Sequence, residues 1–362
     1  MQGTRDTQVA HRSQQQVSLI SCLGVMSCVY AGIPAHGYRW YKSAMDIDLS
    51  VFLRRVARGR NGSEHLQRHE AAMVLAELLS PGADQLQLGA FLIAERMKGE
   101  SSEELAGFVD AARRHIKGFG ESRAPQGAVD MPCYAGKRRA APVHLVAALQ
   151  ARDAGIPVVL HGLEHIAGRL SAWQAVQTAG VCRAGTLDEG LRVLLSDGIV
   201  YMDLADICPP LFALTALRPR LGVRTFSHTV ARLLNPLQCE GQLNGVFHTP
   251  YVALTAQVNV LLEQTRSLVF MGAEGDPELY ADRQKLLAAQ QCNEKASLSF
   301  SDAHCALYPR EVGGSPEELL QHFTALRNDR MDVREKATLK RMAEAFVFAS
   351  SGKLPHDWIQ DE

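Results

Sequence analysis

The sequence predicts an α/β protein, with a small N-terminal all-helical domain before a large α/β domain whose central sheet is flanked by helices. Three observations favour this fold. Apolar residues with helical spacing, joined by short connections, run from about residue 49 to 109. Short apolar runs then alternate with helical stretches over the rest of the chain. The 362 residues, of which 46% are hydrophobic, suffice for one large and one smaller domain.

Capping residues and apolar spacing predict four helices in the N-terminal part. Asp48 can cap the first helix, whose apolar residues follow the i, i+3, i+4, i+7 spacing. Ser101 or Ser102, together with Glu104, forms a capping pattern that opens the fourth helix. The apolar residues of the first helix are Leu49, Phe52, Leu53 and Val56, and the second and third helices are expected over 66–79 and 84–98.

The second part of the chain shows the alternation expected of a sheet with helices on its faces. A stretch with glycine, proline and serine, Gly118–Ala128, is expected to be the hinge that leads into it. We therefore expect a helical domain at 45–120 and an α/β domain at 121–362. The apolar runs that mark the α/β domain are Val143–Leu149, Pro157–Leu160, Trp173–Ala179, Ile199–Leu204 and Leu221–Phe226.

Residues 1–44 are expected to be a disordered or mis-started extension. The apolar run Val17–Ile33 is at the lower limit for a membrane span and is long for the apolar part of an export signal. Met45 directly precedes the first helical pattern and is a natural start. A membrane or export signal in this segment is the alternative.

Charge and cysteine usage exclude some classes of protein. The chain has 38 basic and 39 acidic residues, and removing four basic and one acidic residue before Met45 leaves 34 against 38, a net charge of −4. Nucleic-acid binding would therefore need a local basic patch. The eight cysteines form neither a C-x-x-C motif nor a zinc pattern, which indicates free thiols in a reducing cytoplasm.

Four N-terminal segments and four later ones carry a family resemblance. They are His69–Ala71, Gln87–Leu92, Arg96–Ser101 and Glu103–Gly107, followed by Leu221–Thr225, Leu233–Pro236, Gly245–His248 and Ser267–Gly272. The first four together resemble the helical domain of anthranilate phosphoribosyltransferases, members of glycosyltransferase family 3, and the resemblance covers nearly the whole chain after Met45. It implies a large α/β domain beneath the helices, a sugar phosphate in the cleft between them, and a homodimer formed through residues 45–120.

The loop that holds phosphoribosyl pyrophosphate in this family, Gly-Thr-Gly-Gly-Asp, is altered here. Backbone N–H groups approach a phosphate closely where side chains do not intervene. One glycine is left, the tyrosine fills the volume that a phosphate would need, and the lysine reverses the charge of the acid. The resemblance therefore implies a degenerate donor loop, whose five positions, aligned from Val129, are Cys133, Tyr134, Ala135, Gly136 and Lys137.

Three further family motifs are altered. The Lys-His-Gly-Asn-Arg turn falls on Leu160–Glu164 and keeps only its His-Gly. The serine-rich phosphate-binding stretch falls on Ile166–Ser171, which has few hydroxyl groups. The acidic pair that holds magnesium falls on Pro277 and Glu278, and proline has no side-chain ligand, although Asp276 is an alternative one residue away.

With four motifs altered together, the preferred hypothesis is a non-catalytic protein that binds nucleic acid largely independently of base sequence. The departures fall where a DNA-binding branch of the family departs, which ranks DNA ahead of RNA. We expect no catalytic residue, metal site or cofactor, and a cytoplasmic homodimer whose folded part does not contact a membrane. The side chains expected to bind phosphate are Lys137, Arg138, Arg139, Arg169, Arg218, Arg327, Arg330, Arg334 and Arg341.

Alternatives stay open at two points. The last four arginines fall within about 60° of one helical face, which also suits an ordinary solvated helix. The chain could instead be a glycosyltransferase or phosphoribosyltransferase with an altered donor site and a small, for example aromatic, acceptor. Arg218 matches the family's acceptor-binding arginine, and only this enzyme would need magnesium. A pseudoenzyme with a protein or metabolite partner is the third hypothesis.

Overall fold

A computed structural model describes residues 47–361 except 60, 122, 283–284, 292–293 and 301–305. The predicted extension at 1–44 and the predicted start at Met45 lie outside the described residues. The predicted boundary between residues 120 and 121 stays a prediction.

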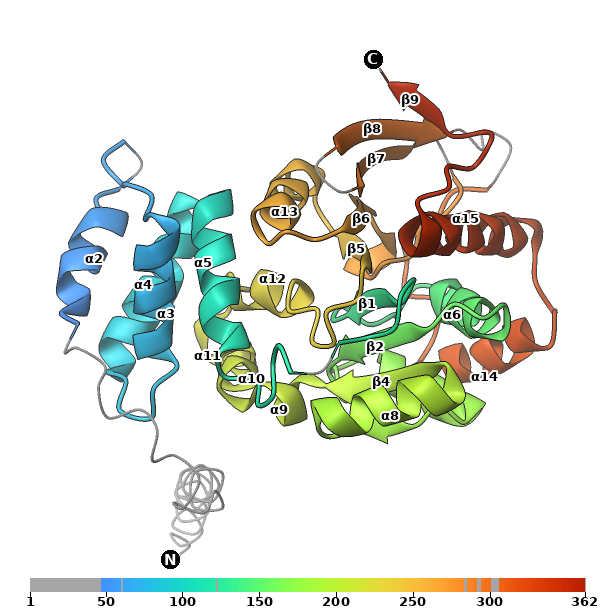
Figure 1. Ribbon diagram of the computed structural model, residues 1–362, viewed down its shortest axis with the longest axis horizontal. Coiled ribbons are helices and arrows are strands. Elements are labelled where there is room, and N and C mark those ends of the chain that lie inside the picture. Colours follow the sequence, from blue (N-terminus) through green and yellow to red (C-terminus); the bar gives the residue numbers. More distant parts are fainter. Residues whose placement is uncertain are drawn as a thin grey trace, which may run out of the picture. The chain divides into compact units, whose positions relative to one another are not determined.

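The four predicted N-terminal helices are confirmed and form a helical bundle (Figure 1). The Asp48 side chain accepts a hydrogen bond from the Ser50 N–H and caps the first helix. Ser101 and Glu104 form the reciprocal capping box that opens the fourth. The bounds of the helices are α2 Leu49–Val56, α3 Arg68–Leu78, α4 Gln85–Lys98 and α5 Ser102–Arg113.

The predicted central sheet flanked by helices is also confirmed. Within the described residues, nine strands lie in the order β3-β4-β2-β1-β5-β6-β7-β8-β9, with parallel pairing from β3 to β6 and antiparallel pairing from β6 to β9. The strands are β1 Val129–Cys133, β2 Val158–Gly162, β3 Arg183–Ala184, β4 Ile199–Asp203, β5 Gly241–Val246, β6 Arg266–Met271, β7 Lys285–Gln291, β8 Glu294–Phe300 and β9 Ile359–Asp361.

The helices of the α/β part cover both faces of the sheet. The helices are α6 Val143–Asp153, α7 Ala172–Val176, α8 Leu187–Asp197, α9 Leu204–Ile207, α10 Pro209–Ala216, α11 Arg218–Leu221, α12 Ser227–Arg232, α13 Pro250–Leu261, α14 Pro316–Arg327 and α15 Val333–Ser351, with 3-10 turns at Gln177–Ala179 and Ala273–Gly275. Alternate side chains of β2 enter different cores, since Val159 packs with α8 and α12 whereas Val158 and Leu160 pack with α6 and α15.

Aromatic packing and two arginines fix the helical bundle to the α/β part. The rings of Phe108 and Phe226 stack with centroids 4.2 Å apart, and Phe91 meets both rings edge-on at 6.2 Å. Arg68 donates to the Leu261 carbonyl at the end of α13, and Arg113 donates to two carbonyls just after α12. These contacts hold α5 against α12 and α13, where the pocket described below lies.

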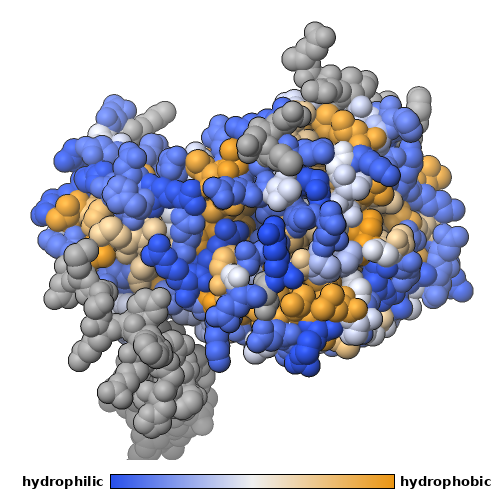
Figure 2. All heavy atoms as spheres, in the orientation of Figure 1, coloured by the Kyte–Doolittle hydropathy of each residue, from blue (hydrophilic) through white to orange (hydrophobic). Residues whose placement is uncertain are grey.

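No helix of the described residues combines the length and the hydrophobicity that crossing a bilayer requires. On the face seen in Figure 2, hydrophilic residues are interspersed with smaller apolar patches.

Candidate functional site

Acidic side chains bind the backbone N–H groups of the loop that follows β1. The Asp276 carboxylate accepts a hydrogen bond from the Ala135 N–H at 2.8 Å. The Glu274 carboxylate accepts from the N–H groups of Arg138 and Arg139 at distances of 3.0 to 3.3 Å. Both carboxylates are buried. These loop N–H groups therefore already bind anions, and the anions belong to the protein itself.

Lys137 is buried in an ion pair. Its Nζ lies 2.7 Å from a Glu278 oxygen and 2.7 Å from the Tyr308 hydroxyl, with only 1% of the residue exposed. The second oxygen of Glu278 accepts from the His144 N–H. Although burial opposes ionisation of Glu278, the nearby Lys137 charge holds the pKa of its carboxyl at about 2. Lys137 is thus enclosed by the protein and is not presented to solvent.

Tyr134 fills the centre of the altered loop. It is buried, and its hydroxyl lies 2.8 Å from Nδ1 of His161. Nε2 of His161 lies 3.2 Å from the Asp130 carboxylate, which also accepts from the Gln242 amide. Burial, with the Asp130 charge, raises the pKa of Tyr134 well above its ordinary value. The tyrosine is therefore a neutral part of a buried network, with no access to a substrate.

The residues at the family's magnesium positions do not fit that ion. The Glu278 oxygens are bonded to Lys137 and His144, and those of Glu274 to loop N–H groups. Asp276 binds the Ala135 N–H. The described residues contain no cluster of three or more His, Cys, Asp or Glu side chains placed to hold a metal. A magnesium ion would have to displace these bonds, and so we derive no step through it.

Five arginines near this loop form what we call the arginine cluster: Arg138, Arg169, Arg218, Arg224 and Arg232. Arg169 forms an ion pair with Glu274 at 3.2 Å. Burial, followed by the charges of Arg232, Arg218 and Arg169, lowers the pKa of Arg224 to about 10. Burial lowers the pKa of Arg169 as well, with Arg138 and Arg218 adding to that effect. These mutual effects indicate a concentration of positive charge.

The members of the cluster differ in exposure. Arg138 and Arg218 are exposed, and Arg139, beside the cluster, is half-buried. The guanidinium of Arg232 lies 5.9 Å from the ring centre of Tyr134. Within the described residues, neither Arg224 nor Arg232 forms an ion pair with a carboxylate, and the Nε atoms of both are buried without a hydrogen-bond partner. Burial lowers the pKa of both arginines, and the nearby Asp276 charge partly offsets this effect without an ion pair to either.

The predicted single helical face for the C-terminal arginines is wrong. α14 ends at Arg327, and α15 begins only at Val333, because Asp332 caps it through a capping box with Glu335. Arg330 therefore lies in the connection between the two helices.

The C-terminal arginines mostly have partners within the chain. Arg327 donates to the Thr178 carbonyl, and Arg334 lies over the Tyr308 ring. Arg341 is buried, with ion pairs to Glu344 and Asp357. Arg327 and Arg330 are exposed. A phosphate-binding role for these residues stays a prediction.

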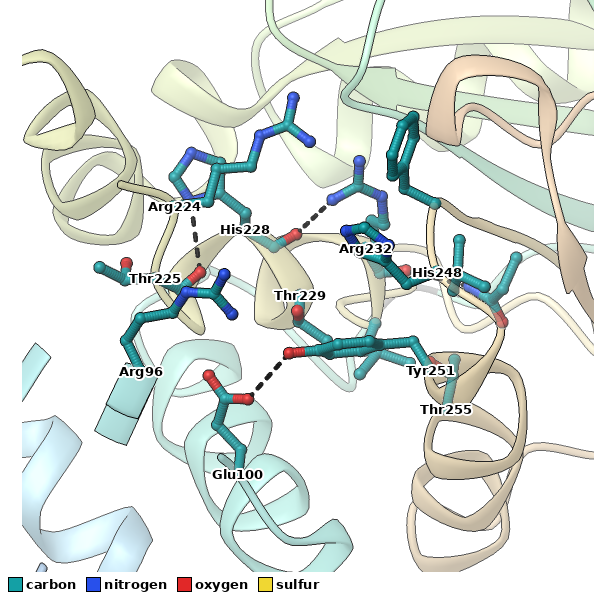
Figure 3. Close-up of a pocket in the computed structure, with 14 residues that line it drawn as sticks. Arg96, Glu100, Arg224, Thr225, His228, Thr229, Arg232, His248, Tyr251 and Thr255 are labelled. Carbon is teal, nitrogen blue, oxygen red and sulfur yellow. Dashed lines mark hydrogen bonds between the residues drawn. The ribbon is translucent and has the colours of Figure 1, made fainter. Parts of the chain in front are cut away.

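A pocket of about 130 Å³ lies between α4–α5, α12 and the start of α13 (Figure 3). Arg224, His228 and Arg232 project from or near α12, and the Tyr251 hydroxyl donates to Glu100 on the opposite side at 3.2 Å. Burial and the two arginines lower the pKa of His228 to about 3, so it is neutral at pH 7. The wall also contains Phe247, which is 48% exposed.

Sequence reasoning did not find all of these residues. It gave no role to Glu274, Arg232 or Phe247, which hold the loop or line the pocket. The available signal is the run of acids Glu274, Asp276 and Glu278, although their spacing does not give the geometry, because Ala273–Gly275 forms a 3-10 turn. No comparable local signal marks Arg232, whose place depends on the packing of α12 against β1 and α5.

Comparison with known proteins places these features in a family. Residues 51–116 match the family described as glycosyl transferase family, helical bundle domain. The chain is 30% identical over 242 residues to the Escherichia coli (strain K12) protein named uncharacterized protein YbiB, covering 66% of this chain and 74% of that one. It is 30% identical over 237 residues to anthranilate phosphoribosyltransferase from Rubrobacter xylanophilus (strain DSM 9941 / JCM 11954 / NBRC 16129 / PRD-1), covering 65% of this chain and 68% of the enzyme.

A solved structure shares the fold. Anthranilate phosphoribosyltransferase from Thermus thermophilus superposes with a TM-score of 0.70 at 20% identity, covering 85% of this chain and 90% of that chain.

We expect Lys137→Met to destabilise the chain strongly at pH 7, because it leaves the Glu278 carboxylate buried beside His144 alone. Removing one partner of a buried ion pair costs about 3–5 kcal/mol. The pKa of Glu278 is about 2 in the folded chain against an ordinary 4.5. Its ionised form therefore stabilises the fold above about pH 4.5, and this contribution is lost as the pH falls towards 2.

Denaturant unfolding of the full chain at several pH values tests this prediction. The difference between wild type and Lys137→Met should narrow in acid. Arg138→Met, at the exposed neighbouring position, is the control and should stay within about 0.5 kcal/mol of wild type. Equal effects of the two substitutions at pH 7 would contradict the structural role of the Lys137–Glu278 pair.

Proposed function

The chain belongs to the anthranilate phosphoribosyltransferase family, and from that premise we propose that it is a non-catalytic member that binds nucleic acid with little dependence on base sequence. One observation carries this proposal. Carboxylates of the chain itself occupy the N–H groups of the donor loop, while Arg224 and Arg232 beside the loop form no ion pair among the described residues. The site thus repels a pyrophosphate at its former place and attracts phosphates next to it.

Loss of the parent reaction follows from electrostatics. Transfer from a pyrophosphorylated sugar requires a bound metal and stabilisation of a leaving group that carries several negative charges. Here Asp276 and Glu274 add negative charge where the leaving group would lie, and Lys137 is neutralised by Glu278. Like charges at these distances disfavour the bound donor. A sugar donor is therefore the less favoured ligand.

The arginine cluster supports nucleic acid as the ligand. Guanidinium groups bind phosphate oxygens with two parallel N–H bonds, and several close together suit a backbone with repeated phosphates. The net charge of −4 from residue 45 onward gives no long-range attraction, so affinity would come from this local cluster. The DNA-binding branch that the loop resembles ranks DNA ahead of RNA.

A homodimer is part of the proposal. Leu86 and Met97 on α4 are 82% and 81% exposed, and Ile93 between them is also exposed. Spacings of seven and four residues put these three side chains on one face of the helix. Exposed apolar side chains gathered on one face are typical of a protein–protein interface. A second copy would cover this face and double the number of arginine clusters.

Reversing the charge of exposed arginines tests the proposal that the chain binds nucleic acid. We expect the triple variant Arg138→Glu, Arg139→Glu and Arg218→Glu to weaken binding to unrelated oligonucleotides to a similar extent, because each of these side chains would bind phosphate. The slope of log affinity against log salt should flatten by about 0.9 for each duplex phosphate that the variant no longer neutralises. Lys137 is left unchanged because it is buried in an ion pair.

The matched control reverses the same number of exposed charges on the C-terminal helices and their connection, with Arg327→Glu, Arg330→Glu and Lys336→Glu. Fluorescence anisotropy over a salt series measures both variants. A larger loss of affinity in the control variant would show that the binding surface lies in the C-terminal region. A strong sequence preference in wild type would indicate base recognition, and no binding at low salt would refute the proposed function.

Acidic substitutions on the apolar face of α4, formed by Leu86, Ile93 and Met97, test whether this face is the dimer interface. We expect wild type to sediment as a dimer and the double variant Leu86→Glu and Met97→Glu to sediment as a monomer, because buried carboxylates would lie unpaired at the interface. Leu195→Glu, at an exposed apolar position of α8, is the control and should stay dimeric. A monomeric wild type, or a double variant that stays dimeric, would contradict the α4 interface.

A further inference from the structure

We infer that the pocket between the end of α4, α12 and α13 holds one nucleotide unit of a single strand, with its phosphate on Arg224 and Arg232 and its base against Phe247. The inference rests on the proposed function and deepens it, because it names a single strand rather than a duplex as the preferred ligand. Three features of the pocket carry it: unpaired cations, an exposed ring, and continuity with the arginine cluster.

The first feature is a pair of arginines that form no ion pair among the described residues. Arg224 and Arg232 both line the pocket, and the Nε atoms of both are buried with no hydrogen-bond partner among the described residues. Nη1 of Arg232 donates to the His228 carbonyl, which leaves the other amino group of the guanidinium for a ligand. Buried polar groups without partners are uncommon, so an anion that accepts these N–H groups would satisfy both arginines.

The second feature is an aromatic ring at the pocket wall. Phe247 follows the end of β5 and is 48% exposed, with its ring 4.8 Å from that of His248 in an edge-on arrangement. A Cβ at Gly275 would lie 3.4 Å from Cβ of Phe247, so the residue is backed by the acidic stretch. A half-exposed ring beside cations is the arrangement on which single-stranded bases stack.

The interior of the pocket also suits a polar planar group. Thr255 Oγ1 is buried without a hydrogen-bond partner among the described residues, and it lines the pocket with Asn244. The volume of about 130 Å³ is well above the roughly 10–15 Å³ that one water needs. The pocket therefore has room for a group larger than one water, and Asn244 and Thr255 give its wall polar side chains.

The third feature distinguishes a strand from an isolated small molecule. Arg224 belongs both to the pocket and to the arginine cluster, whose Arg138 and Arg218 are exposed. The phosphates next to a nucleotide held in the pocket could then reach these exposed arginines. A duplex keeps its bases stacked and paired, so it could contact the exposed arginines but could not place a base on Phe247.

Substitution of Phe247 distinguishes binding in the pocket from binding to the exposed arginines, because only a single strand would use the Phe247 ring. We expect Phe247→Ala in the full chain to weaken binding of a 20-nucleotide oligothymidine at least about fivefold, since one base–aromatic stack is worth roughly that or more. Affinity for a 20-base-pair duplex should change less than about twofold. Phe247→Trp, which keeps an aromatic ring at this position, should bind the single strand about as tightly as wild type. Phe212→Ala, at another exposed aromatic outside the pocket, is the control and should change neither affinity.

Equal effects of Phe247→Ala on strand and duplex, or no effect on the strand, would overturn the inference and leave the proposed function standing. Thymidine monophosphate is the probe for a free nucleotide, and binding as tight as that of the oligonucleotide would overturn the strand as the ligand. No binding of either oligonucleotide at low salt would refute the proposed function, and the inference with it.

Discussion

The hydrogen bonds and the ion pair between the loop after β1 and the acidic stretch at residues 274–278 determine what this loop can bind. Asp276 and Glu274 accept loop N–H groups, and Glu278 pairs with Lys137 in the interior. The acidic stretch is itself tightly enclosed. A Cβ at Gly245 would lie 2.3 Å from the Asp276 carbonyl oxygen, and a Cβ at Gly272 would lie 1.9 Å from the same atom. Only glycine permits this approach at either position.

The backbone conformation at Glu274 is also one that is usually left to glycine. Its φ of 60° is in the left-handed region, which side chains other than glycine adopt at a cost of about 1–3 kcal/mol when they are buried and constrained. The bonds from Glu274 to the loop, to Arg169 and to Tyr308 offset this cost. In the family this loop binds the anionic part of a substrate. Here carboxylates of the chain itself accept hydrogen bonds from the loop N–H groups. Positive charge is concentrated on the arginines beside the loop. This redistribution connects the proposed loss of the parent reaction with the proposed phosphate binding.

Much of the fold could be predicted from local patterns. Asp48 and the Ser101–Glu104 box marked real helix starts, because capping depends on residues close in sequence. The altered loop could be predicted from Tyr134 and Lys137 for a similar reason. The partner of Lys137 could not, because Glu278 is 141 residues away and meets it only through the fold.

The C-terminal arginines show the same limit. The predicted single face requires one continuous helix across residues 328–332, whereas the capping box of Asp332 and Glu335 marks the start of a new helix. The burial of Arg341 against Asp357 depends on how the end of the chain folds back, which no local pattern specifies. Sequence patterns therefore located the basic residues but not their exposure, and exposure decides which of them a phosphate can reach.

Calorimetric titration of the full chain with phosphoribosyl pyrophosphate and magnesium is the most direct test of the central claim, that carboxylates of the chain have replaced the donor in its loop. We predict no saturable heat at millimolar donor, because binding would require the Ala135, Arg138 and Arg139 N–H groups to leave Asp276 and Glu274. Saturable, magnesium-dependent binding that is abolished by an acidic substitution at Gly136 would contradict the claim, since it would place the donor in the loop.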